Sequence, residues 1–269
     1  MYSGTTFRTK SGRMMGVHQK IDRVAHRQIT KLIPKKVIFP DIRDILHFEG
    51  ANGPDGIKRK SPGRDEPWHY IDPTNPDDQA IVGMINDHIF NMAEALKAKN
   101  HERASFEAAW MAHAIVDGLT PAHHYPLSDK IEELWGKSHT ERLTIRDKNI
   151  IKGKNPRDTI SKNWQYWGGG GVFTAHLMFE LGVASTIVPV KFEEDCASDD
   201  DIEQLKTRGF EVLFLEAVHK IYDLQMYDEF GYKGWTRQLA NRTRRVLVPE
   251  IVKLVILGWY QAVLLSEKK

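Results

Sequence analysis

The residues best suited to chemistry in this chain are a histidine and an aspartate near its middle. The segment Phe106–His124 reads FEAAWMAHAIVDGLTPAHH. Its apolar residues recur at helical spacing, which predicts a helix with one buried stripe. His113 and Asp117 lie four residues apart on that stripe. Burial of an imidazole and a carboxylate is costly unless something pairs them. A metal ion would pair them, and a His–Asp hydrogen bond buried for packing alone is the alternative.

Two other predicted helices carry inward-facing residues of the same types. In a helix that opens near Val172, His176 and Glu180 are four residues apart and share a face with apolar neighbours. In the first helix, expected over about residues 13–32, His18 lies on the apolar face. A core histidine with a satisfied hydrogen bond is the ordinary explanation for His18 taken alone.

The segment from residue 35 to about residue 76 is irregular. It is rich in glycine and proline and has no period of 2 or 3.6. Irregular stretches of this length are uncommon in compact domains and are usually functional or disordered. Its aromatic WHYIDP sequence is unlike a disordered tail. We therefore predict an ordered active-site loop that carries Asp55, His69 and Asp72.

The remaining pattern predicts an all-α fold. Further helices are expected at about residues 77–100, 101–119, 127–137, 202–227 and 235–265, with a kink in the last one at Pro249. The glycine run 168–171 has no preceding strand and no following Lys-Ser/Thr, so we interpret it as a hinge or a close packing point rather than a phosphate loop. With no strand alternation, repeat or domain break, residues 1–269 are predicted to form one multi-helix bundle with long irregular active-site loops.

Composition sets limits on the function. Hydrophobic residues make up 41% of the 269 residues and charged residues 28%, as in ordinary globular proteins. A net charge of +2 is too weak to argue for binding to nucleic acid or to an acidic membrane. The lone Cys196 excludes cysteine-rich zinc sites. Without an apolar secretory signal or a clear membrane-spanning stretch, a cytoplasmic protein is expected.

Taken together, the candidate ligands indicate a metal site with more than one ion. They are His18, Asp55, His69, His113, Asp117, His123, His176 and Glu180. Histidine and carboxylate ligands without thiolates suit zinc, and also iron or manganese. Eight ligands exceed what one tetrahedral ion needs, so two or three ions are expected. Clustered metals are typical of enzymes that hydrolyse phosphate esters.

These residues stand in motifs that resemble the zinc-dependent phospholipase C and P1/S1 nuclease superfamily. The resemblance covers most of the chain, with strong matches in four short motifs. HAIVDGLTPAH is similar to the family's His-x3-Asp-x3-Pro-x-His segment, and WHYIDP to its His-aromatic-x-Asp segment. The family's ligand aspartate roughly fourteen or fifteen residues before that histidine selects Asp55, with Asp65 as the substitute. HLMFE is similar to the phospholipases' His-x3-Glu, whereas the nucleases end in Asp. His18 matches the histidine on the family's first helix.

The resemblance implies how the ligands are distributed. One zinc takes Asp55, His69, His113 and Asp117; a second takes His123, His176, Glu180 and water; a third shares Asp117 and binds His18 and the mature N-terminal residue. That N-terminal residue is usually Trp in the family, whereas this chain starts with Met-Tyr. The third site is therefore built differently, for instance with His26, or is weak or absent. His124 is a candidate for a supporting residue rather than a ligand.

The resemblance further implies in-line attack on phosphorus by a metal-activated hydroxide. Asp55, as ligand or nearby base, would orient or deprotonate the attacking water, and the zinc at His123, His176 and Glu180 would stabilise the leaving oxygen. Glu180 in place of Asp favours a phospholipase C-like phosphodiesterase.

Two other functions stay open. A single-strand nuclease or 3′-nucleotidase would stack bases on aromatic residues such as Trp68, Tyr70, Trp164 and Trp167. A catalytically silent helical zinc-binding protein is the third alternative. The expected partner is a phosphodiester substrate, either a phospholipid head group or a nucleotide, without a stable nucleic-acid complex.

Overall fold

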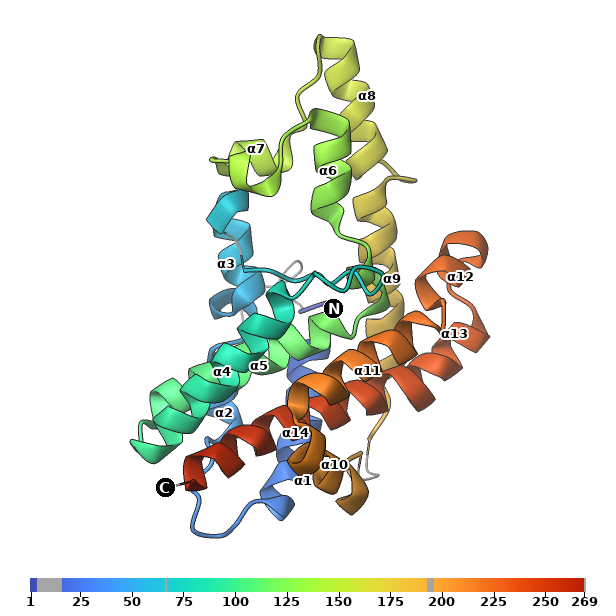
Figure 1. Ribbon diagram of the computed structural model, residues 1–269. Coiled ribbons are helices and arrows are strands. Elements are labelled where there is room, and N and C mark those ends of the chain that lie inside the picture. Colours follow the sequence, from blue (N-terminus) through green and yellow to red (C-terminus); the bar gives the residue numbers. More distant parts are fainter. Residues whose placement is uncertain (4–15, 66, 193–195, 269) are drawn as a thin grey trace.

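The computed structural model describes residues 1–3, 16–65, 67–192 and 196–268, and every regular element within those ranges is helical (Figure 1). The α-helices are α1 (Val17–Leu32), α2 (Ile42–His47), α3 (Pro54–Lys60), α4 (Ala80–Lys97), α5 (His101–Gly118), α6 (Leu127–Trp135), α7 (Ile145–Asn149), α8 (Pro156–Trp167), α9 (Val172–Ile187), α10 (Asp199–Arg208), α11 (Phe210–Tyr222), α12 (Met226–Lys233), α13 (Arg237–Arg242) and α14 (Val248–Glu267). Short 3-10 turns lie at Gly50–Asn52, Gly63–Asp65, Pro121–His124 and His139–Glu141. The predicted all-α class is therefore confirmed for the described residues.

Helix α5 lies at the centre of the bundle and contacts α1, α2, α4 and α14. Its N-terminus is capped by Asn100, whose side chain accepts a hydrogen bond from the backbone N–H of Arg103 (3.0 Å). The indole N–H of Trp259 on α14 donates to the carbonyl of Ala108 (2.9 Å). Gly258 permits this close approach, since a Cβ there would lie 2.9 Å from Ile115 Cδ1.

The expectation of a single buried stripe on α5 is wrong. Almost every residue from Ala104 to Gly118 is buried, and the half-buried exceptions are Phe106 and Trp110. Alanines at positions 104, 108, 109, 112 and 114 let neighbouring helices approach from several sides. His113 and Asp117 therefore lie inside a helix that is enclosed nearly all round, where a polar group is more costly than at the edge of a core.

A smaller lobe of α6, α7 and α8 lies above this bundle, beside α3 (Figure 1). It has its own buried apolar cluster, which includes Leu127, Ile131, Ile151 and Tyr166. Lys148 of α7 donates to the carbonyl of Ser61 (2.6 Å) just after α3, so the two short helices are joined. The chain's first residue lies between the lobe and the bundle.

Several predicted boundaries are corrected by the structure. The segment 35–76 is less irregular than expected because it contains α2 and α3, which are capped by Asp41 and Gly53. The single helix expected over residues 202–227 is divided among α10, α11 and α12. The breaks lie at Gly209 (φ = +83°) and at Gln225 (φ = +50°), where the chain takes positive φ values. Helix α8 was not predicted. The first helix begins at Val17, and residues 13–15 of its expected span lie outside the described residues.

The C-terminal helix departs from regular geometry where the sequence predicts a kink. A π turn at Thr243–Leu247 stands directly before Pro249, whose ring and missing N–H break the ordinary hydrogen-bond ladder. The continuous helical segment Arg237–Glu267 is long and apolar enough to cross a membrane by length and composition. However, 67% of its most apolar window is buried in the protein, which is how a core helix behaves.

Candidate metal centre

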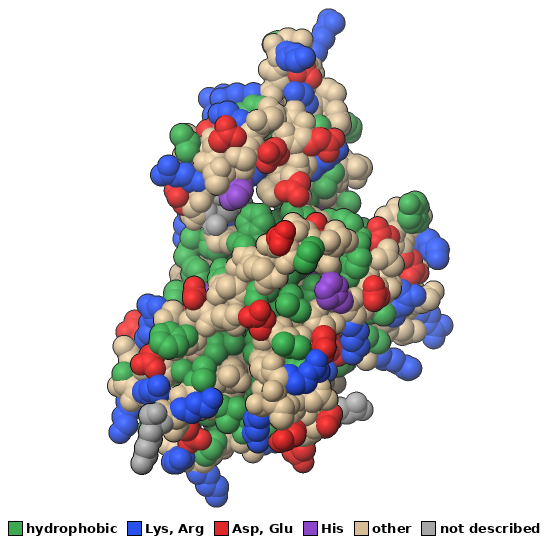
Figure 2. All heavy atoms as spheres, viewed as in Figure 1, with side chains coloured by type: hydrophobic (Ala, Val, Ile, Leu, Met, Phe, Trp, Pro, Cys, Tyr) green, Lys and Arg blue, Asp and Glu red, His purple; other side chains and the backbone are tan. Residues whose placement is uncertain are grey.

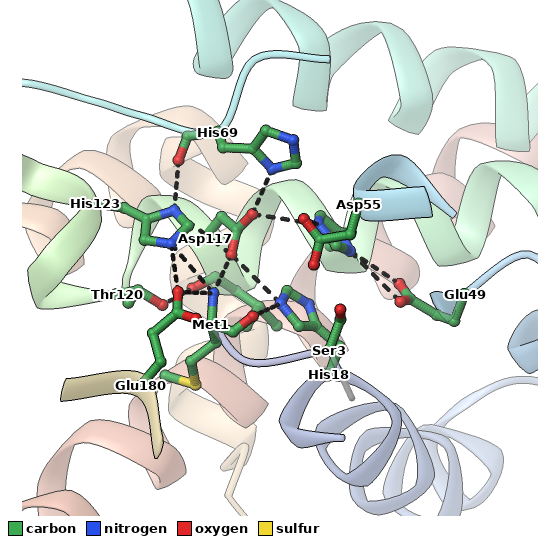
Figure 3. Close-up of polar contacts among 12 residues, drawn as sticks. Met1, Ser3, His18, Glu49, Asp55, His69, Asp117, Thr120, His123 and Glu180 are labelled. Atoms are coloured by element: carbon green, nitrogen blue, oxygen red, sulfur yellow. Dashed lines mark hydrogen bonds and ion pairs between the residues drawn. The ribbon is translucent and has the colours of Figure 1, made fainter. Parts of the chain in front are cut away.

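All eight predicted ligands come together at the C-terminal end of α5. Figure 3 labels His18, Asp55, His69, Asp117, His123 and Glu180 among them. His18 comes from α1, Asp55 from the first turn of α3, His69 from the extended chain before α4, His113 and Asp117 from α5, His123 from the turn after it, and His176 and Glu180 from α9. Within the described residues they form three groups in which the ligand-type atoms lie within 4.8 Å of one another: His18, His113 and Asp117; Asp55, His69 and His113; and His123, His176 and Glu180.

Asp117 lies at the middle of the centre, and both of its carboxylate oxygens are engaged (Figure 3). Oδ2 accepts from Nδ1 of His69 (2.7 Å) and is 3.2 Å from Nε2 of His113. Oδ1 is 3.4 Å from Nε2 of His18 and 3.6 Å from Nδ1 of His123. One carboxylate with neighbours on both oxygens is the arrangement needed to bridge two cations.

The group on α9 has its imidazoles held in a defined orientation. Nδ1 of His123 donates to the backbone carbonyl of His69 (2.7 Å), which leaves Nε2 as the lone-pair nitrogen. Oε1 of Glu180 lies 3.0 Å from Nε2 of His123 and 3.1 Å from Nε2 of His176. Three donor atoms therefore converge on one point, and the turn made by Pro121 brings His123 to it.

The group at α3 reaches the solvent through one residue, Asp55. The side chain of Asp55 is 26% exposed, whereas those of His69 and His113 are 2% exposed. Within the described residues, Nε2 of His69 and Nε2 of His113 are buried without a hydrogen-bond partner. Buried polar atoms are rarely left in this state, and coordination to a metal would satisfy both.

The main chain of Met1 also enters the centre. Its amino group contacts Asp117 and lies 3.3 Å from Nε2 of His123 and 3.4 Å from Oε1 of Glu180. Its carbonyl oxygen accepts from Nε2 of His18 (2.8 Å). Burial lowers the pKa of this amino group, but the carboxylates around it raise the pKa above its ordinary value. The alternative with His26 is wrong, because Nε2 of His26 bonds to the carbonyl of Pro40 (2.9 Å).

Two buried acids near the centre were missed by sequence reasoning. Both oxygens of Glu49 lie close to Nδ1 of His113 (3.3 and 3.4 Å). Asp22 is fully buried one turn after His18, and burial and the nearby Glu49 raise its pKa well above its ordinary value. Glu49 could not be predicted from sequence spacing, because its partner His113 lies 64 positions later in the chain. Asp22 had a usable signal, since His18-x3-Asp22 repeats the His113-x3-Asp117 pattern.

The ionisation states of the centre suit metal binding. Burial lowers the pKa of His69 to about 4 and that of His123 to about 3, so both imidazoles are neutral at pH 7. Burial alone raises the pKa of Asp117 and Glu180, but the Met1 amino group and adjacent histidines hold both pKa values well below the usual range. Neutral imidazoles and ionised carboxylates are the forms that coordinate metals.

The pKa values of His113 and Asp55 are shifted by the charges around them. Burial alone lowers the pKa of His113, but Glu49 and Asp117 raise it well above its ordinary value. Burial alone raises the pKa of Asp55, but His113 and His69 lower it to about 2. His113 therefore has to release a proton when it binds a metal, which couples metal affinity to pH.

Other candidates lie outside the centre. Nε2 of His124 donates to the carbonyl of Gly118 (3.0 Å), so this residue caps the end of α5. Asp72 accepts from the N–H and hydroxyl of Thr74 in a turn, and is not brought to the metal centre with the rest of its segment. Asp65, the substitute for Asp55, is 53% exposed and pairs with Arg64.

If the centre binds a metal, replacing Glu49 with glutamine should weaken its affinity for zinc, used as the probe, about 10- to 100-fold, since the carboxylate beside Nδ1 of His113 is lost. Competition with a fluorescent zinc chelator measures the affinity. Asp44→Asn is the matched control, because Asp44 is an exposed acid on the adjacent α2. Equal zinc affinities for the two variants would show that Glu49 has only a structural role.

The donor set fits zinc: five imidazoles and three carboxylates converge, whereas Cys196 lies elsewhere, beside Gln28. The same set also permits manganese or iron, and carboxylate-bridged ions are common to all three. Comparison of the chain with protein-family models, with curated proteins and with solved structures found no match.

Proposed function

We propose that this chain is a zinc-dependent phosphodiester hydrolase of the phospholipase C-like type, with a bundle of the phospholipase C/P1 nuclease kind. The observation that carries the proposal is the convergence of eight nitrogen and oxygen donors in three groups, two of which share His113 and lie against Asp117. A packing role for these residues would not require so many polar groups in one enclosed place, since each is costly to bury.

In this proposal each zinc has its own set of ligands. Asp55, His69, His113 and Asp117 would hold one zinc; His123, His176 and Glu180 would hold a second; and His18 with Asp117 would contribute to a third, beside the main chain of Met1. Bound zinc supplies positive charge to the phosphate and lowers the pKa of water to about 7.

Asp55 is the residue to which we assign the action on the attacking water. It is the most exposed carboxylate of the centre and also lines the cleft above it. With a pKa of about 2, Asp55 is ionised at neutral pH but is a weak base. As an ionised carboxylate, Asp55 would orient the water by accepting a hydrogen bond or would take its proton.

Asp55→Asn is expected to lower kcat for phosphodiester hydrolysis about 100-fold, because the amide cannot accept the proton or hold a metal as a carboxylate does. Steady-state kinetics and zinc content should be measured on the same sample. Asp65→Asn is the control, since Asp65 is exposed and lies in the same segment. Full activity in Asp55→Asn would refute the role of Asp55 in the reaction.

The proposal is tested by metal analysis of the purified protein together with hydrolysis assays. We expect two or three zinc ions per chain and turnover of a soluble phosphatidylcholine analogue or another phospholipid, lost with chelator and restored by zinc. Single-stranded DNA and RNA serve as the competing substrates. Preferential cleavage of either would identify the nuclease alternative, and bound zinc with no turnover would identify a catalytically silent zinc protein. Absence of zinc would refute the proposal.

A further inference from the structure

A cleft of about 470 Å³ opens above the metal centre, between the small lobe and the bundle. Asp55, His123, His176 and Glu180 line it, so a molecule in the cleft would be in contact with two of the three ligand groups. The cleft is therefore the place where a substrate of the proposed hydrolase would lie. The chemistry of its other walls indicates what that substrate is.

One side of the cleft is cationic. Its basic residues are Lys58 and Arg59 on α3 and Lys148 on α7. Arg142, before α7, also lines the cleft, but it is buried and donates to the carbonyl of Ser138 (3.2 Å). Lys148 joins the two helices through the carbonyl of Ser61, so these charges belong to one wall. The ammonium of Lys58 lies 5.0 Å from the centre of the Tyr70 ring, and no carboxylate of the described residues pairs with it.

The positive charge extends beyond the cleft. The small lobe, residues 127–167, contains nine basic and six acidic residues, a net charge of +3 in a chain whose net charge is +2. Figure 2 shows Lys and Arg side chains at the tip of the small lobe and along its α7 side. A charge of one sign around a cleft raises the local concentration of ligands of the opposite sign.

Carboxylates suited to a cationic head group are missing from the described lining. The acids there are Asp55 and Glu180, and both belong to the metal centre. On the α3–α7 side, a choline group would therefore meet lysine and arginine instead of an anionic partner. The wall disfavours a zwitterionic phospholipid and favours one with a net negative charge.

The opposite side of the cleft is apolar. Leu127 and Ile131 lie one turn apart on α6, and Phe173 and Leu177 lie one turn apart on α9. These pairs offer an apolar surface beside the metal centre, where the phosphate of a substrate would lie, and the glyceride part of a phospholipid would need such a surface. Among the aromatic residues of the lining, Tyr70 lies against His123 (5.3 Å between ring centres), whereas Trp167 is 37% exposed.

We infer that the cleft selects anionic phospholipids, with Lys58 and Arg59 contacting the negative head group and the α6–α9 side holding the acyl portion. The inference rests on the proposed function, because it takes the phosphodiester of the lipid as the group that is hydrolysed. Recognition of charge, however, is a property of the wall and is measurable without turnover.

The test compares monomeric dihexanoyl phosphatidylglycerol with dihexanoyl phosphatidylcholine. Binding to the chelator-treated protein is followed by calorimetry, and kcat/KM is measured with zinc present. We expect phosphatidylglycerol to be favoured about 10-fold in both measurements. The double variant Lys58→Gln/Arg59→Gln should reduce this ratio to about 1, whereas the control Lys60→Gln should preserve it, since Lys60 is on the same helix but does not line the cleft.

The results of this comparison distinguish the inference from its alternatives. A ratio at or below 1 in the unmodified protein, or an unchanged ratio in the double variant, would overturn the inference. Tighter binding of a thymidine hexanucleotide than of either lipid would replace it with single-strand recognition. Charge-selective binding without hydrolysis of either lipid would refute the proposed hydrolase while leaving the selectivity of the cleft in place.

Discussion

Replacing Asp117 with asparagine is expected to abolish zinc binding at two of the three ligand groups and to lower kcat by more than about 10⁴-fold. Both carboxylate oxygens are engaged, so neither neighbouring group keeps its full donor set when the charge is lost. The lowering of the pKa of water that bound zinc would supply should be lost with it. Zinc content and steady-state kinetics on the same preparation measure both effects.

Two further variants separate a chemical effect from misfolding. His176→Asn should remove one zinc and leave the group at Asp55 loaded, so it remains informative if Asp117→Asn does not fold. His124→Asn removes a buried histidine that caps α5, and it should lower stability without changing zinc content. If Asp117→Asn keeps its zinc and its activity while remaining folded, the bridging role is wrong.

Removing metal should lower the melting temperature by about 5–10 °C for each tightly bound ion. A ligand present at 100 times its Kd stabilises the folded state by about 2.7 kcal/mol, and each kcal/mol corresponds to about 2–4 °C in a chain of this size. Several carboxylates and imidazoles are enclosed together here, so they gain more from a cation than exposed ligands would. Differential scanning fluorimetry with chelator, and then with added zinc, measures the shift.

The specificity of this shift is checked in two ways. Magnesium should fail to restore the melting temperature, because imidazole-rich sites do not suit a hard cation. The melting temperature of Asp117→Asn should hardly respond to chelator. An unmodified protein that melts at the same temperature with and without chelator would contradict metal binding at this centre.

The sequence was informative where a local pattern determines the structure. The helical spacing of α5 and α9 places His113 with Asp117 and His176 with Glu180 on inward faces, as predicted. The turn signal at Pro121 likewise places His123 beside them. These relations depend on residues a few positions apart, so periodicity and turn chemistry suffice to predict them.

Other features depend on contacts between distant segments. Glu49 has no local pattern, because its partner His113 belongs to another element. The nearly complete burial of α5 follows from the helices around it, and its own apolar periodicity indicates only one stripe. Helix α8 was overlooked since PRDTISKNWQYW is polar; the structure shows that Asn155 caps it and that Tyr166 anchors it in the core of the lobe.

The separation of the ligands along the chain has a consequence for folding kinetics. The contact between His69 and Asp117 closes a loop of 48 residues, and that between His123 and Glu180 closes one of 57. Long-range closures of this kind form late and slowly, since their entropy cost precedes any gain from contacts. The His113–Asp117 pair can form early within α5, but a complete ligand shell requires the whole of the chain from α1 to α9. Zinc uptake during refolding should therefore follow the global folding phase rather than precede it.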